Sequence, residues 1–375
     1  MCGIVGVIGG RPAAPLLLDA LRRLEYRGYD SAGIATLVAG RIERRRAPGK
    51  LDRLASRLEA EPLGGVTGIG HTRWATHGVP NETNAHPHIS DGVALVHNGI
   101  IENFQALRTE LVAHGHSFAT QTDTEVVAHL VSAQLKQGVP PREAAAMAIR
   151  RLHGAFALAI LFEGHEELLV VARKGCPLAI GYGADEMYVG SDALALAPLT
   201  DRIQYLEEGD IGFLDRKGAV ILDAQDQPAE RPIRQTALSG ALIGKGNHRH
   251  YMEKEIFEQP AVLGDTLRSF ADPSTHRIVL PELPFDMADV TRIAAVACGT
   301  ASYACLVGKY WFESLAGLPV DWDIASEFRY RDAPLVPGQV GLFVSQSGET
   351  ADTLAAMRHL RAAGHKALAV VNVPE

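Results

Sequence analysis

Cysteine is scarce in this sequence, and its four cysteines show no pairing pattern. Cys2, Cys176, Cys298 and Cys305 are widely separated, and no Cys-x-x-Cys motif is present. A disulfide framework or a zinc site is therefore not expected, and the composition suits a reducing compartment.

Long apolar runs and an excess of positive charge are also missing. No stretch approaches the roughly 18 uninterrupted apolar residues of a membrane-spanning helix. The N-terminus lacks a basic region, and glycines interrupt its apolar run, so no secretory signal is expected and we predict a cytoplasmic protein without membrane contacts. The net charge of −8 argues against nucleic acid as a partner. A hydrophobic content of 47% over 375 residues is typical of a globular protein of two or three domains.

The pattern of secondary structure changes about two-thirds of the way along the chain. The first part alternates short apolar runs, such as 4–8 and 155–162, with amphipathic helical patterns, such as 13–24, and predicts sheets covered by helices. Strand–turn–helix units follow, as at 293–315 and 340–363, and predict a doubly wound parallel sheet. We place the domains at 2–235 and 253–375.

A linker is predicted at 236–252, where glycine, serine and polar residues cluster. His248 and His250 in this segment could ligate a metal. Because no carboxylate or cysteine lies at a useful spacing, we favour their interpretation as polar linker residues and expect no metal site.

Cys2 is the first candidate catalytic residue. Removal of Met1, which the small second residue favours, would leave a thiol and a free α-amine on one residue. An α-amine titrates near neutral pH, so it could act as a general base toward its own thiol. A cysteine at the second position can equally be a small hydrophobic residue, and Cys2 alone does not decide between the two.

The segment 71–78 ends in polar residues that follow a predicted strand. Arg73 offers a planar fork that suits a carboxylate, and Thr76 and His77 add donors beside it. The alternative for the Arg73-Trp74 pair is a surface arginine next to a tryptophan that flanks the core.

Two further motifs carry both a structural and a functional interpretation. Asn98-Gly99 after a strand indicates a tight turn, and the Asn98 amide with the Gly99 N–H could also stabilise an oxyanion. Thr122 and Glu125 fit a capping box, which leaves Asp123 to accept an ammonium group; alternatively, Asp123 is simply an acid at a helix start. Together with Cys2, these residues describe glutamine, with its carboxylate, its ammonium group and a side-chain amide under attack.

Five segments of the sequence resemble, in order and spacing, the class II glutamine amidotransferase family. These segments are 1–6, 24–33, 71–78, 97–103 and 122–125. The resemblance implies an N-terminal-nucleophile fold, an αββα sandwich. It implies Cys2, Asn98 and Gly99 as catalytic residues, with Arg27 beside the nucleophile and Trp74 at the mouth of an ammonia passage. The glutamine-binding residues that it implies are Arg73, Thr76, His77, Gly99 and Asp123.

The second domain has two strand-to-helix bends that are rich in hydroxyl groups. Ser345–Thr350 forms one, and Thr300 lies at the other. Hydroxyls and N–H groups at a helix N-terminus can bind phosphate, although they can also only cap the helix. Neither a Walker loop nor a GxGxxG motif is present, so ATP and NAD are not expected, and we predict no cofactor.

These bends, with segments 327–331 and 345–350, resemble the first sugar isomerase (SIS) domain of amidotransferases that aminate a sugar phosphate. The resemblance implies that amide nitrogen from glutamine converts fructose 6-phosphate to glucosamine 6-phosphate, and that the full-length protein is a homodimer. It also implies further sequence beyond residue 375, so we expect the chain as written to hydrolyse glutamine without forming amino sugar. The implied sugar-phosphate ligands are Thr300, Ser345, Gln346, Ser347 and Thr350.

Two alternatives fit less well. Another class II amidotransferase, such as asparagine synthetase or phosphoribosylpyrophosphate amidotransferase, would need a pyrophosphate or phosphoribosyl site, and no such loop occurs. A sugar-phosphate sensor would usually carry a DNA-binding helix-turn-helix, and one with an inactive glutaminase would lack Cys2 or Asp123.

Overall fold

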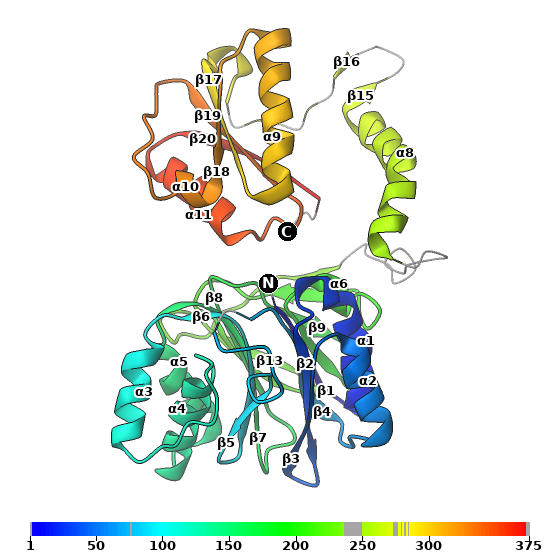
Figure 1. Cartoon of the computed structure of the whole chain (residues 1–375), viewed down its shortest axis with the longest axis vertical. Coiled ribbons are helices and arrows are strands. Elements are labelled where there is room, and N and C mark those ends of the chain that lie inside the picture. The colour runs from blue at the N-terminus through cyan, green and yellow to red at the C-terminus, as the bar shows by residue number, and fades with distance from the viewer. Residues whose placement is uncertain are drawn as a thin grey trace. The chain divides into compact units, whose positions relative to one another are not determined.

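The computed structural model describes residues 2–75, 77–235, 250–272, 277–278, 280, 283 and 285–372. The chain divides into two compact units, Met1–Gly244 and Lys245–Glu375 (Figure 1). Of the predicted linker, residues 236–249 lie outside the described residues, and Tyr251 begins a helix. No helix in the described part of the chain is both long and apolar enough to cross a membrane.

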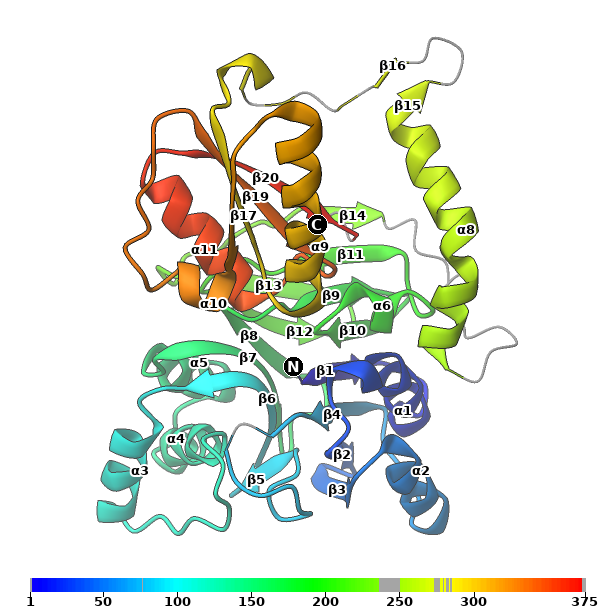
Figure 2. The same cartoon turned by 45° about the horizontal axis from the view of Figure 1, so that its top comes forward.

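The first unit contains two antiparallel sheets (Figure 2). In the described residues, the larger sheet has the order β14-β11-β9-β10-β1-β4-β2-β3 and the smaller has the order β13-β12-β8-β7-β6-β5. The larger sheet consists of β1 (Gly3–Ile8), β2 (Ser31–Val38), β3 (Arg41–Pro48), β4 (Thr67–Arg73), β9 (Ala179–Tyr182), β10 (Met187–Gly190), β11 (Arg202–Tyr205) and β14 (Ile233–Gln235). The smaller consists of β5 (His88–Ser90), β6 (Val93–Ile101), β7 (Gly154–Phe162), β8 (Leu169–Lys174), β12 (Ile211–Asp215) and β13 (Gly218–Leu222).

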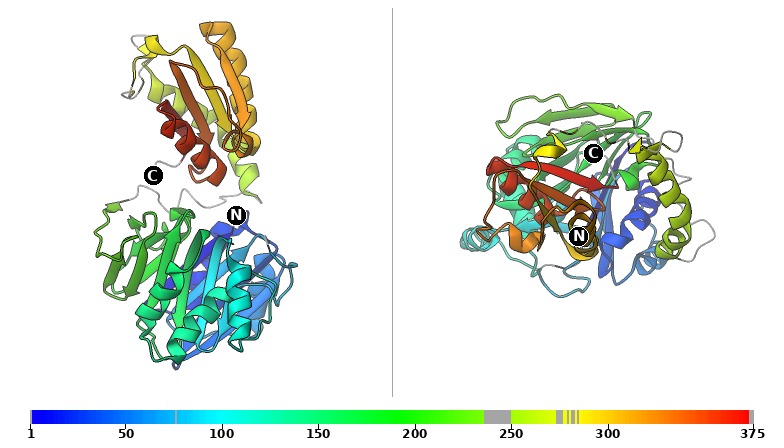
Figure 3. Two further views of the ribbon diagram at one scale, coloured as in Figure 1. Left: turned by 90° about the vertical axis from the view of Figure 1, so that its left-hand side faces the viewer. Right: turned by 90° about the horizontal axis from the view of Figure 1, so that it is seen from above.

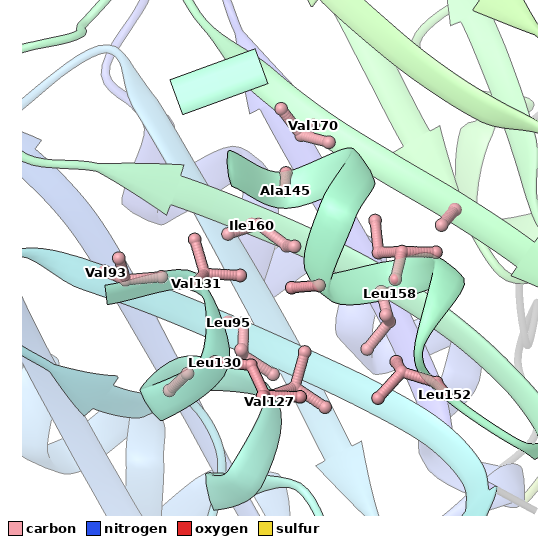
Figure 4. Close-up of a cluster of buried hydrophobic side chains, with 14 of the residues drawn as sticks. Val93, Leu95, Val127, Leu130, Val131, Ala145, Leu152, Leu158, Ile160 and Val170 are labelled. Atoms are coloured by element: carbon pink, nitrogen blue, oxygen red, sulfur yellow. The ribbon is translucent and has the colours of Figure 1, made fainter. Parts of the chain in front are cut away.

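Helices cover the outer face of each sheet, which gives four layers. Those on the larger sheet are α1 (Ala13–Leu24), α2 (Leu51–Ala60) and α6 (Ala193–Leu196), and those on the smaller are α3 (Phe104–Ala113), α4 (Glu125–Lys136) and α5 (Pro141–Arg150). Strand β6 shows why the layers form: Val93 and Leu95 face the helices, as Figure 4 shows, whereas Ala94 and Val96 face the other sheet. Each large side chain buried in this way contributes about 1.5–3 kcal/mol. The predicted αββα sandwich is confirmed.

The second unit contains a parallel sheet of order β18-β17-β19-β20 (Figure 3). Its strands are β17 (Arg292–Ala297), β18 (Val320–Ile324), β19 (Gln339–Ser345) and β20 (Lys366–Val371). Helix α9 (Gly299–Trp311) covers one face, and α10 (Ala325–Phe328) and α11 (Ala351–Ala362) cover the other. The predicted doubly wound sheet is therefore confirmed. The strand order reverses between β17 and β19, and ligands of such sheets bind at the carboxyl ends of strands at this position.

Shorter elements complete the second unit. Helix α8 (Tyr251–Phe270) begins it and is followed by the strand pair β15 (Ala271–Asp272) and β16 (Arg277–Ile278). The short helix η2 (Met287–Asp289) precedes β17, and η3 (Phe312–Ala316) follows α9. In the first unit, a further short helix, η1 (Glu25–Arg27), follows α1.

Candidate active site

Cys2 immediately precedes β1, an inner strand of the larger sheet. Its Sγ lies 3.2 Å from the backbone nitrogen of Trp74 and 3.4 Å from the Trp74 carbonyl oxygen. Trp74 follows β4, the neighbour of β1, so strand pairing places the two residues together. Burial raises the pKa of the Cys2 thiol, so at neutral pH the sulfur keeps its proton and needs a base to become nucleophilic.

Arg73 is the last residue of β4, and its guanidinium is buried. Nη2 donates to the carbonyl oxygens of His77 and, at 3.2 Å, Gly78. Nη1 lies 3.8 Å from Asp30 Oδ1 and makes no hydrogen bond to any described residue. A buried N–H group without a hydrogen-bond partner is costly in a protein interior, so Nη1 suits an anionic ligand atom.

Asn98 and Gly99 lie inside β6, paired with Ala157 and Phe156 of β7. The predicted tight turn is therefore wrong: pairing with β7 continues through Ile101 and overrides the local turn signal. Gly99 has a φ of +112°, and a Cβ there would lie 2.0 Å from the Ala155 carbonyl oxygen, so only glycine fits. Asn98 Nδ2 donates to the Cys2 carbonyl oxygen at 3.1 Å.

Asp123 lies just before α4, and its carboxylate is buried. Oδ2 accepts a hydrogen bond from the Ile101 backbone nitrogen at 2.8 Å. His77 Nδ1 is 4.0 Å from Oδ1, and His97 Nδ1 is 4.0 Å from Oδ2. Asp123 thus faces the same region as Arg73 and Cys2, but from the opposite sheet and its helices.

The predicted capping box of Thr122 and Glu125 does not form. Glu125 instead accepts hydrogen bonds from the Ala119 and Thr120 backbone nitrogens at 2.8 and 2.7 Å, while Thr122 Oγ1 contacts His88 Nε2 at 3.2 Å. Burial opposes ionisation of Glu125, but these hydrogen bonds and that of His129 outweigh it and lower the pKa of Glu125 to about 2. The carboxylate therefore holds the loop before the helix rather than the helix start.

A small pocket gathers most of the predicted residues. Its predicted lining residues are Cys2, Arg73, Trp74, His77, Gly99 and Asp123. Lining residues that the sequence did not indicate are His86, His97, Thr122 and Thr124. Thr76 lies outside the described residues. The pocket combines a thiol, a cation and a carboxylate.

Of the two other predicted residues, Trp74 lines the pocket and Arg27 does not. Arg27 is buried and pairs with Asp192 at 2.5 Å, and Ser191, the residue before Asp192, accepts from the Ile4 backbone nitrogen through Oγ at 3.0 Å. Arg27 thus supports the strand that carries Cys2 and is not part of the pocket lining. Trp74 is 48% exposed and packs edge-on against Tyr29, with ring centroids 5.3 Å apart.

Four buried histidines in or beside the pocket were not indicated by the sequence: His86 and His97 line it, and His71 and His88 contact His86. The rings of His71 and His86 stack at 4.1 Å, those of His86 and His88 meet at 4.5 Å, and Thr124 Oγ1 lies 3.0 Å from His86 Nε2 and 2.9 Å from His97 Nδ1. Burial lowers the pKa of all four, that of His71 to about 3, so the rings are neutral at pH 7. Among the described residues, no three histidines, cysteines or acids are arranged to hold a metal.

The predicted sugar-phosphate residues of the second unit lie at the ends of β17 and β19. Ser345 Oγ and Thr350 Oγ1 are 3.0 Å apart, and Ser347 Oγ accepts from the Glu349 backbone nitrogen at 3.2 Å. Thr300 lies in the first turn of α9, and both Thr300 and Gln346 are exposed. At the described starts of α9 and α11 no side chain caps the helix, so these hydroxyls do not serve as caps.

Two family models match the chain. One describes a glutamine amidotransferase domain and matches residues 71–198, and the other describes an SIS domain and matches residues 286–375.

Two curated relatives carry the same name. The glutamine–fructose-6-phosphate aminotransferase [isomerizing] of Mesorhizobium japonicum is 59% identical over 375 residues, which are 100% of this chain and 62% of the relative. The protein of that name from Brucella suis biovar 1 is 58% identical over 373 residues, 61% of its length. The chain thus spans about three-fifths of the length of these curated relatives.

Two solved structures share the fold at lower sequence identity. The glutamine phosphoribosylpyrophosphate amidotransferase from B. subtilis, complexed with ADP and GMP, has a TM-score of 0.55 and 19% identity, covering 100% of this chain and 82% of that chain. The structure of the allosteric regulatory enzyme of purine biosynthesis also has a TM-score of 0.55, with 20% identity, and covers 100% of this chain and 81% of that chain.

Proposed function

Because this chain is homologous over its whole length to glutamine–fructose-6-phosphate aminotransferases and carries a glutamine amidotransferase domain and an SIS domain, we propose that it uses glutamine to aminate a sugar phosphate. The first unit hydrolyses glutamine to glutamate and ammonia. The second unit contributes to a site in which the whole protein converts fructose 6-phosphate to glucosamine 6-phosphate.

The pocket that joins Cys2, Arg73 and Asp123 carries this proposal. Glutamine is a zwitterion whose reactive group, the side-chain amide, lies beyond its two charges. Arg73 binds the α-carboxylate through Nη1, which makes no hydrogen bond to any described residue, and Asp123 binds the α-ammonium group. His77 adds a polar group near Arg73, and we assign Thr76, which lies outside the described residues, to glutamine binding on the resemblance alone. The side-chain amide then reaches Cys2.

The reaction begins with transfer of the Cys2 thiol proton to the residue's own α-amine, after Met1 has been removed. The raised pKa of this thiol is the reason that a base is needed. The sulfur attacks the side-chain carbonyl carbon of glutamine, and Asn98 Nδ2 with the Gly99 N–H stabilises the oxyanion. The α-amine returns the proton to the departing ammonia, and water hydrolyses the resulting thioester to glutamate.

Further residues are assigned to the passage of ammonia, to support of the nucleophile and to binding of the sugar phosphate. Trp74 lies at the mouth of the ammonia passage, and Arg27 supports the nucleophile strand. The phosphate and hydroxyl groups of fructose 6-phosphate bind at the hydroxyl-rich ends of β17 and β19, where free helix N–H groups favour anions. These ligands are Thr300, Ser345, Gln346, Ser347 and Thr350. We place the full-length protein in the cytoplasm as a homodimer, on the sequence features described above.

Glutamate release by the 375-residue polypeptide tests the glutaminase proposal. We expect Cys2→Ala to abolish glutamate release from glutamine, because no other group supplies the nucleophile. Cys305→Ala, which removes a buried thiol of the second unit, is the matched control and should retain activity. Glutamate release by Cys2→Ala at the wild-type rate would contradict the proposal.

A further inference from the structure

The side-chain amide of Asn98 can adopt two orientations that differ by exchange of its oxygen and nitrogen, and only one directs N–H groups toward Cys2. Nδ2 lies 3.1 Å from the Cys2 carbonyl oxygen, and Oδ1 lies 3.0 Å from His71 Nε2. His71 belongs to β4 and Asn98 to β6, so the contact joins the two sheets. The Cys2 carbonyl oxygen, which can only accept, and the group that His71 presents to Oδ1 therefore decide together which orientation is stable.

The backbone carbonyl of His97 fixes the tautomer of His71. The carbonyl oxygen lies 3.0 Å from His71 Nε2, and because a carbonyl oxygen can only accept, Nε2 must carry a hydrogen. The same N–H faces Asn98, so it requires an acceptor, Oδ1, on that side. A flipped amide would place its own N–H groups against this N–H and its oxygen against the Cys2 carbonyl oxygen.

The surroundings keep His71 in this state. The ring is buried, Nδ1 has no hydrogen-bond partner among the described residues, and the ring stacks on His86 with an interplanar angle of 28°. Burial lowers its pKa to about 3, so a second proton is not bound near neutral pH. The ring thus presents one fixed donor.

We propose that His71 is a positioning residue for glutamine hydrolysis, whose Nε2–H holds the Asn98 amide with Nδ2 directed toward the oxyanion formed by attack of Cys2. This inference rests on the proposed function. Without the His71 donor, only the Cys2 carbonyl oxygen would oppose the flipped orientation, in which oxygen instead of nitrogen faces the developing negative charge.

A double-mutant cycle between His71 and Asn98 tests this role. His71→Phe keeps an aromatic ring of similar size but removes the donor. We expect kcat for glutamine hydrolysis to fall about 10–100-fold, below the 10²–10³-fold that an oxyanion donor supplies, with the KM changing less than about threefold. In an Asn98→Ala background, the same substitution should change kcat less than about twofold, because no amide remains to be oriented.

Two further variants sharpen the comparison. His71→Gln can place an amide N–H close to the position of Nε2 and should recover most of the lost kcat. His114→Gln replaces an exposed histidine at the end of α3 and should not change either constant. Equal losses from His71→Phe in both backgrounds, or a rise in KM alone, would overturn the inference.

The tautomer can be measured without turnover. Long-range proton–nitrogen correlation NMR on the wild-type chain, with the His71 signals assigned from His71→Gln, should show a neutral ring protonated at Nε2 at pH 7. A proton on Nδ1, or on both nitrogens, would overturn the inference even if His71→Phe failed to fold. If the wild-type chain released no glutamate, the glutaminase proposal would fail, and this spectrum would still decide the state of His71.

Discussion

Arg73 and Asp123 give the pocket two buried charges of opposite sign. Arg73 is 3% exposed and Asp123 is 2% exposed, yet no hydrogen bond joins them in the described structure. Arg73 is held by two carbonyl oxygens and lies 3.8 Å from Asp30, whereas Asp123 is held by the Ile101 nitrogen. A zwitterionic ligand can therefore bind both without first breaking an ion pair between them.

Asp123→Asn tests the residue that we assign to the ammonium group. Asparagine keeps an acceptor for the Ile101 nitrogen, so the fold should be retained while the negative charge is lost. Removal of one partner from a buried charge pair costs about 2–5 kcal/mol, so we expect the KM for glutamine to rise at least about 30-fold. Steady-state glutamate release measures it, with exposed Glu102→Gln as the control. An unchanged KM would remove Asp123 from the binding site.

Strands β4, β5 and β6 bring together histidines that are distant in the sequence. His71, His88 and His97 lie on these strands, and His86 lies just before β5. A histidine that is buried and neutral in the folded state becomes protonated on unfolding whenever the pH is below about 6.5. Acid therefore favours the unfolded state of this region.

The stability of the first unit should consequently decrease as the pH falls from 7 to 5. The folded pKa values are depressed, so the stabilisation is complete above about pH 6.5 and decreases below it, by about 1.4 kcal/mol per pH unit for each histidine that stays neutral. Calorimetric unfolding at several pH values measures the slope. His88→Phe should lower the slope by the contribution of one histidine, about 1.4 kcal/mol per pH unit, and exposed His165→Gln should leave the slope unchanged. A stability that does not vary between pH 7 and 5 would contradict the assignment of neutral buried rings.

Periodic elements of this chain could be predicted from the sequence, whereas local polar motifs could not. The helix predicted at 13–24 matches α1, because its apolar positions recur at helical spacing and are buried against β1. Asn98-Gly99 was misinterpreted because its pairing with Ala157 of β7 is set by tertiary structure. Thr122–Glu125 was misinterpreted because Glu125 binds the nearby Ala119 and Thr120 nitrogens instead, while Thr122 contacts His88. The structure nevertheless places Asn98 beside Cys2, whose carbonyl oxygen accepts from Nδ2, and Gly99 lines the same pocket as Cys2.

The cluster of buried histidines at the site could not be predicted from the sequence. Nothing in a single sequence shows that residues 71, 86, 88 and 97 share one buried cluster, because their proximity depends on the packing of the two sheets and α4. The available signal was histidine at otherwise apolar strand positions, as in the run from Val93 to His97. Such a position requires a hydrogen-bond partner inside the fold.

On the scale of the whole molecule, the two proposed sites belong to separate compact units. The residues proposed to hold glutamine are in Met1–Gly244, and the hydroxyl-rich ends of β17 and β19 are in Lys245–Glu375. Glutamine hydrolysis in the absence of sugar should therefore depend on the first set of residues alone.

Substitutions in the 345–350 loop should affect sugar-phosphate binding and not glutamine hydrolysis. Hydrogen bonds to a charged group contribute about 1.5–3 kcal/mol each, so we expect Ser347→Ala with Thr350→Val to weaken fructose 6-phosphate binding more than about tenfold. Saturation-transfer NMR, which detects weak ligands, measures binding, with exposed Ser314→Ala as the control. Wild-type binding by the double variant, or loss of glutamate release, would contradict the separation of the two sites.

The central claim is that Cys2, once it is the first residue, carries the acyl group of glutamine. The most direct test is to mix the wild-type polypeptide with glutamine, quench with acid during turnover and map the N-terminal peptide by mass spectrometry. We predict a peptide that begins at Cys2 and carries a glutamyl thioester on its sulfur, with no such adduct in Cys2→Ala. Turnover by a chain that retains Met1, or an acyl group on Cys176, Cys298 or Cys305, would contradict the account.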